Sequence, residues 1–261
     1  MLPGHVLREL VQNDRVIGGM TPKCSDAAAR LYKLFVEGEC IITNARTAEM
    51  CKLTENSFRD VNIAFANELS MICDKFDVDV WELIKLANRH PRVNILQPGP
   101  GVGGHCIAVD PWFIVSQAEG QARLIKTARE VNDSKPQWVM NKVDAAVADH
   151  LSLHSEKSEK DVVIACFGLA FKPDIDDLRE SPALEITRNI SSRHAGKILV
   201  VEPNILSLPG SLKNAELCTA EEAISRADVL LLLVDHKPFK SIPASALQGR
   251  QIVDTRGIWL V

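Results

Sequence analysis

Cys106 and Asp110 stand four residues apart at the end of a glycine-rich stretch, PGPGVGGHCIAVDP, which spans residues 98–111. A deprotonated thiol is a nucleophile, and the N-terminus of a helix favours the thiolate. If a helical turn begins near Cys106, the carboxylate of Asp110 lies on the same face. Glycine-rich backbone also lets a chain approach a ligand closely. The stretch therefore predicts a loop that presents a nucleophilic cysteine, with a buried cysteine in a tight turn as the alternative.

The same loop matches the spacing G-x-G-x-x-G of a dinucleotide-binding turn through Gly99, Gly101 and Gly104. That motif should follow a buried strand and open a helix that holds the pyrophosphate, and only VNIL precedes it here. Pro98 and Pro100 also remove backbone N–H groups from the loop. We therefore expect no dinucleotide at this loop.

A polar stripe precedes the loop in the sequence. Lys52, Asn56 and Arg59 fall at positions i, i+4 and i+7 of an apolar helical pattern, which places them on one face. A lysine beside a thiol could stabilise an oxyanion or transfer a proton. Taken alone, the stripe fits a solvated face equally well.

Composition narrows the class of protein. The chain has 261 residues, of which 46% are hydrophobic and 25% charged, which is ordinary for a globular protein of one or two domains. Its net charge of −4 gives no reason to expect nucleic acid, and no apolar run is long enough to span a membrane. The seven cysteines include no C-x-x-C pair, which favours free thiols in the cytoplasm over disulfides or a metal site.

Three segments must position these residues. Residues 1–45 predict one β-α-β unit, with strands at 15–19 and 39–44 around a helix at 25–38 that Ser25 caps. Residues 46–155 predict a central helical domain that carries the cysteine loop. Its expected helices are a long one from Thr47 over about thirty residues, one from the Asp79 cap to Asn88, and one over about 121–151.

Residues 156–261 predict a small domain of the doubly wound α/β class. Four nearly continuous apolar runs alternate with helices, one of which Ser181 and Pro182 open. Strands that are apolar on both faces indicate a parallel sheet covered on both sides, which binds ligands at the carboxyl ends of its strands. The four expected strands are 161–168, 197–203, 228–235 and 251–257.

Three stretches in this order, AEMCKLTENSFRDVNIAFANEL, PGPGVGGHCIAVDP and FGLAFKPDIDDLRESPA, resemble the UDP-glucose/GDP-mannose dehydrogenase family. The longer run NRHPRVNILQPGPGVGGHCIAVDPWFIV looks closest to the bacterial subgroup that oxidises UDP-N-acetyl-D-mannosamine for surface polysaccharides such as enterobacterial common antigen. The resemblance implies a cytoplasmic homodimer, a UDP-sugar substrate and NAD as the cofactor.

The resemblance also implies a mechanism, a four-electron oxidation of the sugar C6 alcohol to a uronate through a thiohemiacetal and a thioester on Cys106. Lys52 and Asn56 match the family's oxyanion-stabilising and water-organising pair, and Asp110 matches its proton-handling carboxylate. Arg179 matches an arginine that reaches NAD. The positions that match substrate contacts are Arg59, His90, Arg92, Gly103, Phe171, Lys172 and Arg256.

The first segment departs from the family pattern. Family members begin with a complete NAD-binding Rossmann domain, whereas residues 1–45 resemble only its end and contain no strand followed by a glycine motif. We therefore expect a remnant of that domain and a chain that is inactive alone. A non-catalytic module for UDP-sugar binding or dimerisation is the alternative.

Overall fold

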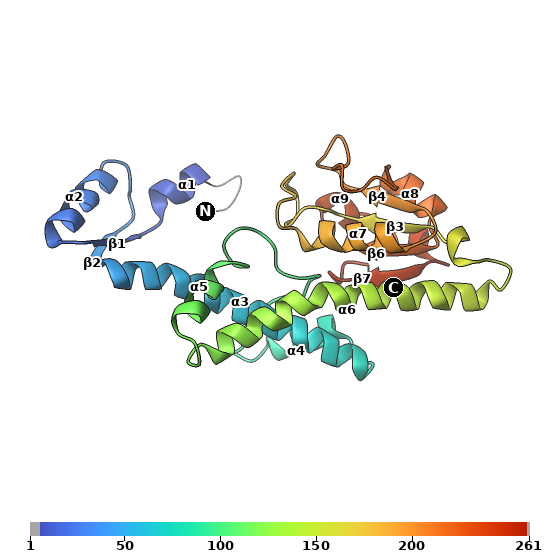
Figure 1. Ribbon diagram of the computed structural model, residues 1–261, viewed down its shortest axis with the longest axis horizontal. Helices are drawn as coiled ribbons and strands as arrows, with labels where there is room; N and C mark the ends of the chain where they lie inside the picture. Colours follow the sequence, from blue (N-terminus) through green and yellow to red (C-terminus); the bar gives the residue numbers. More distant parts are fainter. Residues whose placement is uncertain (1–5, 260–261) are drawn as a thin grey trace.

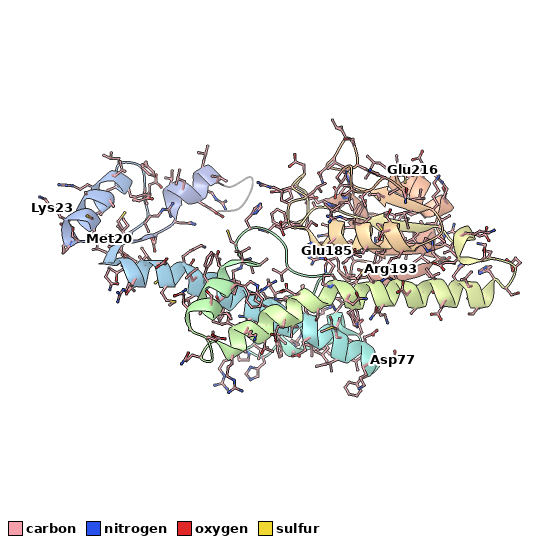
Figure 2. The ribbon with its side chains drawn as sticks, in the orientation of Figure 1. Met20, Lys23, Asp77, Glu185, Arg193 and Glu216 are labelled. Atoms are coloured by element: carbon pink, nitrogen blue, oxygen red, sulfur yellow. The ribbon has the colours of Figure 1, made fainter. Side chains whose placement is uncertain are left out.

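A computed structural model describes residues 6–259 of the chain and has an elongated shape (Figure 1). A small β-α-β unit lies at one end and a five-stranded sheet at the other. Two long helices, α3 (Ala45–Lys75) and α6 (Arg123–Leu153), run between them and pack against each other. Met20 and Lys23 lie at the first end and Glu216 at the second (Figure 2).

The N-terminal unit consists of α1 (Val6–Gln12), β1 (Arg15–Gly19), α2 (Pro22–Tyr32) and β2 (Cys40–Asn44). The two strands pair in parallel, which confirms the expected β-α-β order. Residues 1–5 of the expected remnant at 1–45 lie outside the described residues.

The bounds and cap predicted for the first helix are wrong. The helix begins at Pro22, after Thr21, whose side chain accepts from the Cys24 N–H. Ser25 cannot cap the helix because its hydroxyl accepts from the Gly19 N–H at 2.9 Å. A threonine followed by proline is a good cap and first position, and that pair decides where the helix starts.

The central helices follow the predicted order. The Asn44 side chain caps α3 by accepting from the Thr47 N–H at 2.9 Å, and the Asp79 side chain caps α4 (Val80–Ala87). A short helix, α5 (Asp110–Gln117), lies between them and α6 in the sequence and packs against both α3 and α6. The helix that follows Cys106 is therefore held against both long helices of the central region.

All strands of the C-terminal sheet are parallel, in the order β5-β4-β3-β6-β7, as expected for a doubly wound fold. The sequence did not predict β5, a three-residue edge strand whose residues are all half-buried. The strands are β3 (Ile164–Phe167), β4 (Ile198–Val201), β5 (Ala215–Leu217), β6 (Val229–Leu232) and β7 (Gln251–Asp254).

Helices cover both faces of this sheet. Ile164 and Cys166 of β3 belong to a core cluster shared with α6 and α7 (Pro182–Arg193). Their neighbours Ala165 and Phe167 belong to a second cluster with α8 (Ala220–Arg226), α9 (Lys237–Lys240) and α10 (Ala244–Leu247). Burial on both faces explains why the strands are continuously apolar.

The order of the strands creates a topological switch point. The chain leaves β3 toward β4 and β5, and β6 and β7 add on the opposite side of β3. The loops that follow β3 and β6 therefore run apart, and parallel α/β sheets bind ligands in the crevice that this leaves. None of the described helices is long and apolar enough to cross a membrane.

Candidate active site

The helical turn predicted after Cys106 is present. The N–H groups of Val109 and Asp110 donate to the Cys106 carbonyl at 3.1 and 2.8 Å, and Asp110 begins α5. Asn56 on α3 is only 4% exposed, and its Nδ2 donates to Asp110 Oδ2 at 2.5 Å. Cys106 itself is exposed. An accessible thiol thus lies one turn before a carboxylate that a buried amide orients.

The polar stripe on α3 divides in the folded chain. Asn56 is buried, whereas Lys52 and Arg59 are exposed. Lys52 Nζ lies 3.3 Å from Glu55 Oε2, and these two side chains are 62% and 64% exposed. A role for Lys52 beside the thiol therefore stays a prediction.

Lys172, in the loop after β3, brings three of the predicted residues together. Burial lowers the pKa of Lys172, the positive charge of Arg59 lowers it further, and the thiolate charge of Cys106 opposes this. The protonation of Lys172 thus depends on charges carried by α3 and by the cysteine loop.

The glycines of the cysteine loop are needed for contact with Phe171. A β-carbon on Gly104 would lie 3.2 Å from the Phe171 ring, and one on Gly103 would lie 2.4 Å from the Glu180 carbonyl oxygen. Gly104 also has a φ of +86°, which glycine adopts without strain. The close approach that these glycines permit is therefore between two loops of the protein.

Arg256, which follows β7, links the C-terminal sheet to the cysteine loop. Its Nε donates to Asp235 Oδ1 at 2.9 Å, and its Nη1 lies 3.5 Å from the Pro98 carbonyl oxygen. Although burial raises the pKa of Asp235, Arg256 and Lys240 together hold it below its ordinary value. The carboxylate is thus ionised and fixes the guanidinium at the loop.

A cavity of about 170 Å³ opens at the switch point between β3 and β6. Two cationic side chains, Lys172 and Arg256, line it together with Asp235 and the cysteine-loop residues Pro100 and Gly101. Its position at the carboxyl ends of the strands and its two cations suit an anionic ligand such as a diphosphate.

Three predicted residues lie elsewhere in the described part of the chain. His90 and Arg92 are exposed in the segment after α4, where His90 Nδ1 accepts from the Arg92 N–H. Arg179 is 71% exposed and forms a two-pronged contact with Asp177 at 2.9 and 2.7 Å. The hydrogen bonds from Arg179 lower the pKa of Asp177 to about 2. None of the three lines the cavity.

A buried polar network supports the cysteine loop, and the sequence did not predict it. The Gly99 N–H donates to Asn67 Oδ1, and Asn67 Nδ2 donates to Asn132 Oδ1, each at 2.9 Å. Asn132 Nδ2 and Arg129 Nη1 both donate to Asp60 Oδ1, at 2.8 and 2.6 Å. Polar residues recur at helical spacing along α3. This pattern could have revealed the network, because it marks a helix face distinct from the apolar one.

The residues of the N-terminal unit do not by themselves fit NAD. The last two residues of β1 are Gly18 and Gly19, but protein atoms fill the space beside both. A β-carbon on Gly18 would lie 2.4 Å from the Asn44 carbonyl oxygen, and one on Gly19 would lie 2.5 Å from the Ser25 nitrogen. These glycines serve the packing of the unit and leave no cradle for a pyrophosphate. Across residues 6–259, no cluster of side chains suits a metal ion.

Two family models match most of the chain, the central domain of the UDP-glucose/GDP-mannose dehydrogenase family at residues 46–134 and its UDP-binding domain at residues 165–260. A UDP-N-acetyl-D-mannosamine dehydrogenase of Salmonella typhi is 66% identical over 99% of this chain and 62% of its own length. An NDP-N-acetyl-D-galactosaminuronic acid dehydrogenase of Ralstonia solanacearum is also 66% identical, over 99% of this chain and 59% of its own.

A solved structure of a UDP-D-ManNAc dehydrogenase from Pyrococcus horikoshii superposes with a TM-score of 0.85 at 37% identity, over 99% of this chain and 59% of that one. The chain thus spans about three fifths of the length of the relatives it matches. With both family models in the expected order and a matching fold, the chain belongs to the UDP-glucose/GDP-mannose dehydrogenase family, whose members are oxidoreductases that act on nucleotide sugars.

Proposed function

We propose that this chain supplies the nucleophile and the UDP-sugar site of an NAD-dependent UDP-N-acetyl-D-mannosamine 6-dehydrogenase, which forms UDP-N-acetyl-D-mannosaminuronate. The observation that carries the proposal is the exposed Cys106 thiol one turn before Asp110, with the buried Asn56 amide holding that carboxylate at 2.5 Å. An accessible thiol with an oriented carboxylate one turn further on supplies a nucleophile and a proton acceptor for covalent catalysis on a carbonyl.

The oxidation needs a hydride acceptor, which in this family is NAD and for which Arg179 is the candidate contact in this chain. Once C6 is an aldehyde, the Cys106 thiolate adds to the carbonyl carbon, and the oxygen takes up a proton as the thiohemiacetal forms. After C6 reaches the oxidation level of a thioester, Asp110 accepts a proton from the attacking water. The C–S bond then breaks, which releases the uronate and regenerates the thiolate.

The remaining predicted residues receive roles by position. Asn56 orients Asp110 and the hydrolytic water, and Lys52 stabilises the oxyanion after its side chain leaves Glu55. Arg256 binds the diphosphate at the cavity, and Phe171 and Lys172 contact the sugar beside Gly103. Arg59, His90 and Arg92 contact the substrate from the central domain.

The choice of sugar rests on the closer likeness of the cysteine loop to enzymes for the mannosamine epimer. Because the Ralstonia solanacearum relative matches equally well, the galactosaminuronate branch is the competitor. A role in surface polysaccharide synthesis such as enterobacterial common antigen, in the cytoplasm, follows from the same likeness. The seven cysteines are all free, as a reducing compartment requires.

We also propose a homodimer formed through α3. This helix buries polar residues such as Asn56 and Asp60 against its own chain and exposes an apolar stripe on the opposite side. A helix that turns its apolar side outward needs a partner. The stripe consists of Met50, Phe58, Phe65, Ile72 and Phe76, which are 46–68% exposed.

We propose the domain division 1–45, 46–155 and 156–261, with α6 shared between the last two, because its second half lies in the core of the sheet. The second candidate function, a non-catalytic module that binds UDP-sugar, is favoured by the absence of an NAD cradle among residues 6–44. The two candidates differ in whether hydride leaves the sugar.

Calorimetry on the 261-residue chain tests the binding half of the proposal, with heat expected from UDP-N-acetylmannosamine. NADH absorbance then tests turnover, both for this chain and for a fusion with the N-terminal part of the Salmonella typhi relative that the chain does not match. In the fusion we expect Cys106→Ala to abolish uronate formation, whereas Cys24→Ala, at another exposed thiol, retains it. Full uronate production by Cys106→Ala would refute the nucleophile.

A further inference from the structure

Glu202 follows β4 directly, and its buried carboxylate is surrounded by donors. Its Oε2 accepts from the Leu169 N–H at 2.7 Å, from the Ala170 N–H at 3.1 Å and from His236 Nε2 at 3.0 Å. Its Oε1 accepts from the backbone and side-chain nitrogens of Asn204. Although burial raises the pKa of Glu202, the hydrogen bonds from His236 and the backbone bring it below its ordinary value.

His236, which precedes α9, is fully buried and completes the cluster. The Asp174 N–H donates to His236 Nδ1 at 2.9 Å, so Nδ1 is the acceptor nitrogen of the ring. The ring proton is therefore on Nε2, which donates a hydrogen bond to Glu202 Oε2. The Asp174 side chain in turn accepts from the Lys237 N–H at 2.9 Å. Asp174 has a φ of +60°, a conformation that needs such support in a residue other than glycine.

The two residues therefore hold both ends of one loop, residues 168–174. Glu202 fixes its beginning through two backbone amides, and His236 fixes its end through a third. Between these anchors lie Phe171, which packs on Gly104, and Lys172, which lines the cavity beside β6. The two anchors therefore fix the loop on either side of the residues that face the cysteine loop.

Glu202 also occupies the position at which a dinucleotide-binding sheet has an acidic side chain that is free to bind the nucleotide. In such sheets the acid after the second strand binds the ribose hydroxyls. β4 is the second strand of this sheet in chain order, but both oxygens of Glu202 are occupied by protein donors. On the other side of β3, the cavity beside β6 still offers two cationic side chains, Lys172 and Arg256.

From these contacts we propose that Glu202 and His236 are positioning residues, which set the loop of residues 168–174 so that Phe171 and Lys172 meet the sugar end of the substrate. The inference rests on the proposed UDP-sugar function. It predicts that loosening the loop weakens binding of the sugar more than binding of the uridine diphosphate.

The main variant is Glu202→Gln, which keeps the size of the side chain. Its amide nitrogen must face either the N–H groups of Leu169 and Ala170 or those of Asn204, so one set of donors loses its acceptor. Glu202→Asp retains the charge with a shorter reach and should give an intermediate effect. Glu221→Gln on the exposed first turn of α8 is the matched control.

Two measurements on the 261-residue chain test the proposal. By calorimetry, we expect Glu202→Gln to raise the Kd of UDP-N-acetylmannosamine about tenfold and to raise the Kd of UDP by a smaller factor, while Glu221→Gln changes neither. Simple destabilisation of the domain would weaken both ligands alike, and an equal loss for UDP and UDP-sugar overturns the proposal.

Hydrogen exchange separates this inference from the proposed function. In Glu202→Ala, which removes both acceptor oxygens, we expect faster exchange at the Leu169 and Ala170 amides, while the amides of β3 exchange as in the unaltered chain. If the unaltered chain fails to bind UDP-sugar, the proposed function fails, and exchange still decides whether Glu202 holds the loop. Unchanged exchange at these two amides overturns the positioning role.

Discussion

Asn56 Nδ2 and Asp110 Oδ2 are 2.5 Å apart although the residues are 54 positions apart in the sequence. The contact ties α3 to the first turn of α5 and leaves Cys106 on the loop that enters this turn. Because the Asn56 side chain is buried, the position of the carboxylate depends on this amide.

Replacing Asn56 should therefore reduce catalysis more than binding. In the fusion with the N-terminal part of the Salmonella typhi relative, Asn56→Ala is expected to lower kcat by about 100-fold while the KM for UDP-N-acetylmannosamine changes little. Steady-state NADH kinetics measure both constants. As a control, Asn62→Ala removes a half-buried amide of the same helix whose Nδ2 donates to the Phe58 carbonyl. A loss confined to KM would show that Asn56 binds the substrate instead.

Replacing Gly104 should disturb the contact between the two loops. Gly104→Ala combines a φ of +86° with a β-carbon 3.2 Å from the Phe171 ring, so we expect the free energy of unfolding to fall by about 1–2 kcal/mol. Urea denaturation measures the change. Gly210→Ala, where the added carbon meets open space, should have little effect. Equal effects at both glycines would contradict the packing role.

The buried Lys135 makes stability depend on pH. Desolvation by burial lowers its pKa to about 7, against a raising effect of Asp74, and its Nζ donates to Ser70 Oγ. Above pH 7 the unfolded chain binds a proton at this lysine that the folded chain lacks, so the free energy of unfolding rises with pH. Below the folded-state pKa the amine is charged in both states, and its burial there destabilises the folded chain to the full extent.

Lys135→Met should thus stabilise the chain more at pH 7 than at pH 9, by a difference of about 2 kcal/mol. Urea denaturation at the two pH values provides the comparison. Lys126→Met, an exposed position on the same helix, is expected to have an effect independent of pH. A gain from Lys135→Met that is identical at both values would mean that the amine stays charged in the folded chain.

The apolar stripe on α3 predicts the oligomeric state. Sedimentation of the 261-residue chain should give a dimer, and Phe65→Glu should give a monomer because it places a charge in the middle of the stripe. Lys23→Glu, on α2 at the far end of the molecule, serves as a charge-change control (Figure 2). A stable monomer of the unaltered chain would refute the dimer.

The sequence predicted best those helices and strands whose degree of burial follows one pattern along their length. The strands β3, β4 and β6 were predictable because all their residues are buried, and β7 because of its short apolar run, whereas β5 has only three half-buried residues and no apolar run. The start of α2 was misplaced because Ser25 resembles a cap but bonds to Gly19 instead. Local propensity cannot distinguish two good caps when a tertiary hydrogen bond decides between them.

The relations among the site residues likewise fall into local ones, which the sequence predicted, and tertiary ones, which it did not. The spacing of Cys106 and Asp110 predicted their shared turn because that relation is local. The link from Asn56 to Asp110, the pairing of Arg256 with Asp235 and the burial of Asp60 depend on helices and strands that meet only after folding. Helical periodicity on α3 revealed two faces, but which of them turns inward follows from the neighbours of the helix.

The continuity of α6 has a mechanical consequence. One end of this helix packs beside the α5 turn that follows Cys106, and the other lies in the core of the nucleotide-binding sheet, with no break between them. The helix therefore links the cysteine turn to the C-terminal sheet through one continuous backbone. Pro136 lies within it and has no backbone N–H to donate, so bending of α6 at this residue would change how the two sides of the site face each other.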